Sequence, residues 1–281
     1  MKSYNTFLHG STWVRADFHL HTRKDREFKY TGEDDQYLSS YVDKLKEKKI
    51  QVGIITNHNK FDDEEYKALR KKAIKQEIYL LPGVELSVND GANGIHTLVA
   101  FSEEWISNGE NYIHSFLTAY FSGKSPNEYE RENGRSQHNI IKTINMLEEY
   151  HKDFFIVFAH VEQDNGLWSE LGGGRLIELG KEEVFAKYVR GFQKVRTNDM
   201  REKVKDWLKC AYPAEVEGSD CKSIEGIGNG GHCFIKIGDF SFEAVKFALM
   251  NHCYRVSTSI KPYEHSHIKS IAFQGGLLDG Q

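Results

Sequence analysis

The chain has 281 residues, of which 39% are hydrophobic and 28% are charged, as is typical of a soluble globular protein. The 37 Lys and Arg residues against 41 Asp and Glu residues give a net charge of −4, which argues against a protein that passively coats nucleic acid. This charge does not exclude a nuclease, because bound divalent cations would add positive charge that the count omits. Four cysteines without a C-x-x-C pair indicate neither a zinc ribbon nor a disulfide framework. No segment resembles a signal sequence or reaches transmembrane length, so we expect a cytoplasmic protein without membrane contact.

Helical and strand-like patterns alternate along the chain. The first predicted helix covers residues 34–49, where Tyr37, Tyr41 and Leu45 recur on one face. The other predicted helices cover residues 62–76, two stretches between 105 and 151 that flank a polar loop at 123–134, 200–209 and 242–251. Short apolar runs predict strands over residues 14–20, 52–56, 78–88, 95–101, 154–159, 175–179, 189–195, 215–218, 233–237 and 268–273.

Repeated strand–helix units predict an α/β fold with a parallel sheet and helical crossovers, and their number favours a barrel. The length would allow one large α/β domain or two small ones. Because the sequence has no internal repeat, low-complexity tract or Pro-rich linker, we expect a single domain over residues 1–281.

Residue types that commonly bind metal ions stand at the ends of these apolar runs. His19 and His21 are two residues apart on a predicted strand, so their imidazoles point the same way. Five further ligand-type residues each border an apolar run: His58, Glu85, His96, His160 and Asp220. The carboxyl ends of barrel strands share one face, so these residues can converge there in a polynuclear metal site. Mixed imidazole and carboxylate ligands suit manganese, zinc or iron better than calcium.

The order of these motifs resembles the polymerase-and-histidinol-phosphatase (PHP) family. The matching segments are His-x-His at 19–21, Thr-Asn-His at 56–58, Gly-Val-Glu at 83–85, the single His96, Ala-His at 159–160 and Ser-Asp at 219–220. The resemblance spans residues 14–223. It implies a distorted (β/α)7 barrel, similar to a TIM barrel, with the metal site at the carboxyl ends of the strands. It also implies hydrolysis of phosphoesters with two or three divalent ions.

The resemblance also assigns roles to the individual residues. One ion would be held by His19, His21, Glu85 and Asp220. Glu85 would bridge to a second ion, whose ligands would be completed by His96 and His160. Two cations a few ångströms apart can activate a water molecule and stabilise the charge that builds on the phosphoryl group.

A third ion site of the family is where this sequence departs from the pattern. Asp25 and His58 could serve there, but Lys222 stands where the family has a histidine, and Asn57 replaces the usual aspartate. An ammonium group has no lone pair at neutral pH and repels a cation. Our hypothesis is a site with two ions, in which Lys222 supplies positive charge in place of a third. The same two changes would also fit a weakened or inactive enzyme.

Two arginines are candidates for binding substrate phosphate. Arg175 follows Gly172–Gly174, a run that could form an anion-binding nest or only a flexible turn. Arg135 lies by the long polar loop, from where it could reach over the mouth of the site.

The C-terminal part resembles the PHP module that precedes the ATPase in TrlF-type PHP-ATPases. The matching segments are Gly218–Asp220, residues 223–228, 234–236, 242–243 and the Gly-Gly-x-x-Asp-Gly run at 275–280. In those proteins a strand corresponding to residues 268–281 leads into a P-loop ATPase, so the resemblance implies either an excised N-terminal module or a stand-alone relative. Gly123–Ser125 does not form a Walker A motif, since Thr118 stands where the first glycine should be.

Three functions follow from these observations. The leading hypothesis is a nuclease that acts on nucleic acid with an ATPase domain or subunit, in DNA repair or antiviral defence against phage. The second is a small-molecule phosphatase or nucleotide hydrolase. The third is a catalytically weak module that senses nucleic acid or nucleotides for a partner ATPase, which Lys222 and Asn57 would favour. The sequence leaves open whether the protein forms a homo-oligomer.

Overall fold

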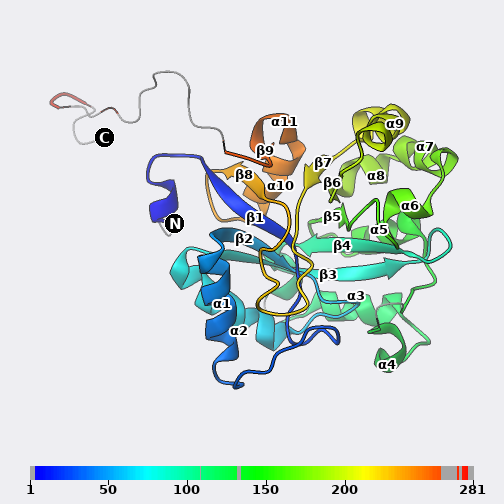
Figure 1. Ribbon diagram of the computed structural model, residues 1–281, viewed down its shortest axis with the longest axis horizontal. Helices are drawn as coiled ribbons and strands as arrows, with labels where there is room; N and C mark the ends of the chain where they lie inside the picture. The colour runs from blue at the N-terminus through cyan, green and yellow to red at the C-terminus, as the bar shows by residue number, and fades with distance from the viewer. Residues whose placement is uncertain (1–3, 108, 132–133, 261–270, 272–273, 278–281) are drawn as a thin grey trace.

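The computed structural model describes residues 4–107, 109–131, 134–260, 271 and 274–277. Their centre is one nine-stranded sheet with the order β7-β6-β5-β4-β3-β2-β1-β8-β9 (Figure 1). The strands are β1 (Thr12–Leu20), β2 (Ile50–Ile55), β3 (Tyr79–Val88), β4 (Ile95–Phe101), β5 (Phe154–Phe158), β6 (Val189–Gln193), β7 (Ala214–Val216), β8 (Cys233–Ile237) and β9 (Val256–Ser257).

The sheet is mixed, which corrects the prediction of a parallel one. β1, β2 and β3 are parallel neighbours, and so are β5, β6 and β7. β4 runs antiparallel to both β3 and β5, and β8 runs antiparallel to β1. The short connection at residues 89–94 explains β4, because a parallel crossover needs a dozen residues or more and a hairpin needs only a few.

The first seven strands curl into a nearly closed barrel, which confirms the predicted α/β barrel fold. The segment after β7 returns to β1, where the Phe18 N–H donates to the Glu217 carbonyl at 3.1 Å. One step further, the Asp220 N–H donates to the His19 carbonyl at 2.8 Å. The last strand of the barrel therefore meets the first at the end where His19 lies.

Helices cover the outside of this barrel. In Figure 1, α1 and α2 lie beside β2 on one side of the sheet, and α7, α8 and α9 lie on the side of β6 and β7. The α-helices are α1 (Tyr37–Glu47), α2 (Asp63–Ala73), α3 (Tyr112–Tyr120), α4 (Pro126–Tyr129), α5 (Ile140–Glu148), α6 (Leu167–Glu170), α7 (Gly173–Lys181), α8 (Glu183–Tyr188), α9 (Asn198–Leu208), α10 (Phe242–Met250) and α11 (His252–Arg255). Four short 3-10 helices are η1 (Asn5–Phe7), η2 (Ile74–Gln76), η3 (Glu103–Ile106) and η4 (Lys209–Ala211). None of the described helices has the length and apolar character that crossing a bilayer requires.

Two apolar clusters separate the inside of the barrel from the outer layer. Alternate residues of each strand point inward, as in Phe155 and Val157 of β5, while Phe154, Ile156 and Phe158 face the helices. α10 adds Phe242 to the inner cluster, where its ring centroid lies 5.3 Å from that of Phe155. Phe155 lies at the end of β5 away from His160, so α10 fills the end of the barrel opposite the predicted site.

Within the described residues, each predicted element has a counterpart except the strand at 175–179, whereas α4, α6, α8, α11 and β9 were not predicted and α4 lies in the predicted polar loop. Residues 175–179 were predicted as a strand but belong to α7, where Leu176 and Leu179 are both fully buried three residues apart. That spacing is helical, and the run is too short for its apolar content alone to distinguish helix from strand. The predicted strand at 268–273 lies outside the described residues apart from Ile271. The prediction of one domain over residues 1–281 also reaches beyond the described part and stays a prediction.

Candidate metal centre

A β-bulge near the end of β1 turns two histidines into the barrel. Asp17 pairs with Gly53 and Leu20 with Ile55, so β1 has one residue more than β2 over this stretch. Before the bulge the inward-facing positions are even-numbered, as in the inner-cluster residue Phe18. After it Leu20 faces outward, and the odd-numbered His19 and His21 point inward, both fully buried.

Glu85 lies in the half of β3 that has left β2 and pairs with β4. Gly83 stands at this change of partner, where a Cβ atom would lie 2.9 Å from the Ile55 carbonyl oxygen and 2.8 Å from that of Val99. A side chain at this position would therefore push the three strands apart. Glu85 follows two residues later on the inward face and is 0% exposed.

The remaining predicted ligands come from three further strands. His96 is the second residue of β4, whose antiparallel direction brings its start, rather than its end, to the same side of the barrel. His160 follows β5 with φ 28°, and Asp220 follows β7 with φ 53°. His96 therefore lies at the amino end of its strand, and Glu85 lies inside β3 rather than at its end. The hairpin between β3 and β4 brings both residues to the side of the barrel where the other predicted ligands lie.

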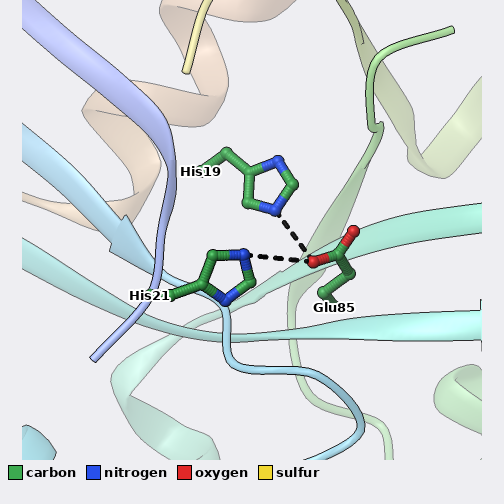
Figure 2. A group of neighbouring side chains, drawn as sticks. All are labelled: His19, His21 and Glu85. Atoms are coloured by element: carbon green, nitrogen blue, oxygen red, sulfur yellow. Dashed lines mark hydrogen bonds and ion pairs between the residues drawn. The ribbon is translucent and has the colours of Figure 1, made fainter. Parts of the chain in front are cut away.

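The carboxylate of Glu85 lies at the centre of the cluster. Its Oε2 atom is 2.9 Å from Nε2 of His19 and 3.4 Å from Nε2 of His21, as Figure 2 shows. Its Oε1 atom is 2.8 Å from Nδ1 of His96 and 4.0 Å from Nε2 of His160. Both oxygens of one buried carboxylate therefore face imidazole nitrogens.

Asp220 and His58 complete this arrangement from opposite sides. Oδ1 of Asp220 lies 3.2 Å from Nε2 of His21 and 3.7 Å from Nε2 of His19. Nε2 of His58 lies 3.1 Å from Oε2 of Glu85. The structure thus brings together the six residues predicted as metal ligands, and His58 joins them.

Asp25 lies behind two of these histidines. Its Oδ2 atom accepts the His58 backbone N–H at 2.7 Å and lies 2.9 Å from Nδ1 of His58 and 3.1 Å from Nδ1 of His21. A carboxylate that accepts from both Nδ1 atoms leaves both Nε2 lone pairs directed at Glu85. This geometry suits a residue that orients the ligands, although the same three residues also form a group that could hold an ion.

Gln193, at the end of β6, is a buried residue of the site that the sequence analysis missed. Its Nε2 group donates to the Gly218 carbonyl at 3.0 Å, which fixes the orientation of the amide. Its Oε1 atom then faces Nδ1 of His19 at 3.0 Å and accepts the His160 backbone N–H at 3.1 Å. The only sequence signal was its place as a polar residue that ends an apolar strand.

Lys222 lies next to the cluster, as its sequence position suggested. Its ammonium nitrogen is 3.2 Å from Oδ1 of Asp220, 3.4 Å from Nε2 of His21 and 2.7 Å from Oε2 of Glu27. An ammonium group so close to Nε2 of His21 indicates that this nitrogen carries a lone pair rather than a proton.

Asn57 and Cys221 have structural contacts that explain them without catalysis. The Asn57 amide accepts the Thr22 N–H at 2.8 Å and donates to the Thr22 hydroxyl oxygen at 2.9 Å, and a carboxylate could not make the second bond. Cys221 is buried beside the His21 carbonyl, and burial raises the pKa of its thiol to about 12. The Cys221 sulfur thus lies 3.6 Å from the His21 carbonyl oxygen as a protonated thiol in the metal-free protein.

The electrostatics of the cluster keep its carboxylates ionised. Burial opposes the charge on Glu85, but the nearby histidines, His19 foremost, outweigh it and hold the pKa of this carboxyl well below its usual range. Burial is likewise outweighed at Asp25 by hydrogen bonds from His21 and His58, and its pKa is lowered. Burial lowers the pKa of His160 to about 4, so its imidazole is neutral at pH 7 and can bind a metal.

The chemistry of this donor set suits divalent cations. Oε1 of Glu85 and Nδ1 of His160 are buried without a hydrogen-bond partner, and the contact of Glu85 with His96 lacks hydrogen-bond geometry. Buried polar atoms without partners cost free energy unless a cation lies between them. Three overlapping groups each bring ligand atoms within 4.8 Å of one another: His19, His21 and Glu85; His21, Asp25 and His58; and His58, Glu85 and His96.

The two arginines predicted to bind phosphate are engaged elsewhere. Arg135 donates to the Ala92 carbonyl at 2.7 Å. Arg175 pairs with Asp90 at 3.2 Å and with Glu178 at 3.2 Å. Both arginines thus contact residues of the turn between β3 and β4 and, among the described contacts, none of the cluster. Their binding of phosphate stays a prediction.

No family model and no curated protein matches the chain. One similar solved structure is a two-domain protein from Bacteroides vulgatus that contains a predicted PHP-like metal-dependent phosphoesterase. The TM-score is 0.53 at 16% identity, over 88% of this chain and 64% of that one, so the chain spans less than two thirds of its length. Another is an amidohydrolase from Chromobacterium violaceum with bound sulfate and no metal, with a TM-score of 0.51 at 14% identity over 76% of this chain and 90% of that one. At such low identity the likeness establishes the fold.

The chain therefore has the α/β barrel fold of PHP-like proteins, and the residues through which its sequence resembles that family meet in one buried cluster that suits divalent metal ions.

Proposed function

We propose that this protein is a metal-dependent phosphoesterase, and more specifically a nuclease that hydrolyses the phosphodiester bonds of nucleic acid. The observation that carries the proposal is the position of Glu85, whose two carboxylate oxygens face the imidazoles of His19, His21 and His58 on one side and His96 on the other. A carboxylate shared in this way is suited to bridge two cations. The PHP-like fold supports the same reaction class.

Two sets of ligands follow from the geometry. His19, His21 and Asp220 lie on the Oε2 side of Glu85, and His96 and His160 lie on its Oε1 side. Manganese, zinc or iron ions bound there would activate a water molecule and stabilise the charge of the phosphoryl group. The chain itself holds these ligands in place through Asp25 behind His21 and Gln193 behind His19.

Lys222 supports a count of two ions rather than three. Its ammonium lies beside His21 and Asp220, where it would repel another cation. Asp25 already accepts the His58 N–H and faces two Nδ1 atoms, which leaves it little capacity to bind an ion. We propose that Lys222 supplies the fixed positive charge, and that His58 directs its Nε2 atom toward the ions.

A cavity of about 500 Å³ opens beside the cluster and favours a second candidate function. It is lined by His96, His160, Gln163, Asp164, Asn165 and Asp220. This volume lies within the range of about 300–1,000 Å³ that is usual for small-molecule sites. A nucleotide or another small phosphoester would fit it, so a small-molecule phosphatase or nucleotide hydrolase is the alternative.

The link to an ATPase, and with it a role in DNA repair or antiviral defence, is proposed from the sequence resemblance of the C-terminal part. A catalytically weak sensing module has less support than the sequence suggested, because Asn57 has a structural role of its own.

The test is hydrolysis of single- and double-stranded DNA and RNA labelled at the 5′ or 3′ end, with manganese added. A small phosphomonoester is assayed in parallel, and a His19→Ala/His21→Ala double variant is the control. Strand cleavage that the double variant loses would establish a metal nuclease. Turnover of the phosphomonoester alone would establish the phosphatase. Protein that binds metal but turns over neither substrate would refute both activities for the isolated chain.

A further inference from the structure

The segments that follow three consecutive barrel strands each contain a left-handed residue that is not glycine. These residues are His160 after β5 with φ 28°, Lys194 after β6 with φ 60°, and Asp220 after β7 with φ 53°. Such residues are uncommon, and where they occur they cluster at functional sites because the backbone strain has to be maintained by the surrounding structure. His160 and Asp220 are predicted metal ligands, and Lys194 is the third residue of this kind.

Lys194 and Lys222, here called the lysine pair, flank the carboxylate of Asp220. The Lys222 ammonium is 3.2 Å from Oδ1 of Asp220, and the Lys194 ammonium is 3.8 Å from Oδ2. The side chain of Lys222 is 39% exposed and that of Lys194 is 22% exposed. Asp220 itself lines the cavity beside the cluster. Both ammonium groups therefore lie next to a residue that lines this cavity, and both are partly exposed.

The charges of the site show what the lysine pair adds. Four carboxylates, those of Asp25, Glu27, Glu85 and Asp220, lie in or next to the cluster. Bound divalent cations would offset much of this negative charge. The lysine pair adds two further positive charges next to Asp220, which favours an anionic substrate such as phosphate.

A purely structural role explains the lysine pair less well. Ion pairs between partly exposed side chains contribute little to stability, so the contacts with Asp220 give the two lysines only a small structural role. Once Asp220 binds a cation, its charge is shared with that cation. Lys194 then becomes available to another anion, and Lys222 keeps its contact with Glu27 at 2.7 Å while its side toward Asp220 can face an anion.

We propose that the lysine pair is a phosphate-binding subsite for a nucleic-acid strand. Lys222, next to His21, contacts the phosphate that is hydrolysed, and Lys194, on the far side of Asp220, contacts a neighbouring phosphate of the same strand. This inference rests on the proposed nuclease function. It adds that the substrate has at least two phosphates in sequence.

The experiment measures how binding of a fluorescent single-stranded oligothymidylate to manganese-loaded protein depends on salt. Anisotropy is read before cleavage, and strand integrity is checked on a gel. Each phosphate contact to a single strand contributes about 0.7 to the slope of log K against log salt. We expect Lys194→Met and Lys222→Met each to reduce the slope by about 0.7 and to weaken binding about tenfold. Lys24→Met is the matched control, because Lys24 pairs with Asp62 at 3.3 Å and makes no described contact with the cluster.

Slopes equal to that of the wild type in both variants, or no strand binding by the wild type, would overturn the inference. Manganese content and strand cleavage are measured separately on the wild type. Failure of the nuclease proposal is thereby distinguished from failure of the lysine subsite.

Discussion

The amide oxygen of Gln193 lies 3.0 Å from Nδ1 of His19, and it cannot turn away because the amide nitrogen donates to the Gly218 carbonyl. Nδ1 of His19 therefore carries the proton, and the Nε2 lone pair faces Glu85. We expect Gln193→Leu to weaken metal binding about 10- to 100-fold, the usual effect of losing a partner that orients a ligand. Metal titration of the metal-free protein measures this, with Gln51→Leu, which loses a hydrogen bond to Thr6, as control. Equal affinities in the two variants would contradict the role of Gln193.

Glu85→Gln tests whether one carboxylate serves both ions. An amide cannot bridge two cations as a carboxylate does, and it places an N–H₂ group among imidazole nitrogens. We expect the metal content to fall and the hydrolysis rate to drop on the order of a hundredfold or more, since metal ions supply several kcal/mol of transition-state stabilisation. Elemental analysis and the strand assay measure both effects. A fully loaded, active variant would show that Glu85 is not the shared ligand.

Metal binding should strengthen as the pH rises. Burial opposes protonation of His19 and His58, but Glu85 and other groups outweigh it and raise the pKa of both above the usual value of about 6.5. Protons therefore compete with the metal to a higher pH than at an ordinary histidine. In metal-free protein these protonated histidines stabilise the fold at low pH, and that contribution is lost as the pH rises through their raised pKa values. Chelation should lower Tm more at pH 8 than at pH 6, and the reverse order would contradict this assignment.

Gly218→Ala should disturb the site through packing alone. A Cβ atom there would lie 2.6 Å from Cβ of His19 and 2.8 Å from Nε2 of Gln193. We expect a loss of about 1–3 kcal/mol in the free energy of unfolding, together with weaker metal binding. Gly174→Ala is the matched control, because its Cβ would meet nothing within 4 Å inside α7 and should stabilise the helix by about 0.5–1 kcal/mol. Denaturant titration measures both changes, and equal effects would refute the packing argument.

The four cysteines should divide into two classes. Cys210 and Cys253 are exposed, whereas Cys221 and Cys233 are buried, and burial raises the pKa of each buried thiol to about 12. A thiol reagent should therefore modify two cysteines in the native protein and all four after denaturation. Rapid modification of Cys221 in the native state would show that the cluster opens to solvent.

The sequence predicted the site well where a residue type that binds metal ions stands next to an apolar run that forms a strand. His19, Glu85 and His160 each border an apolar run, and their residue type and place were enough to predict that they converge. The α/β barrel followed from the alternation of strands and helices in the same way.

Three features were beyond single-sequence reasoning because each depends on contacts between distant segments. The bulge that turns His19 inward is defined by the pairing of β1 with β2. The direction of β4 is defined by its antiparallel pairing with β3 and β5. Gln193 is a site residue only because His19 and Gly218 lie on either side of its amide.

The contact between the first and last strands of the barrel affects how strongly the folded protein resists opening and proteolysis. His21 and Asp220 are 199 positions apart in the chain, yet their side chains lie 3.2 Å from each other. A metal ion held by both would be a reversible cross-link around almost the whole barrel, comparable to a disulfide that closes a long loop. The free metal concentration would then set how often the barrel opens, and with it how long a molecule survives proteolysis.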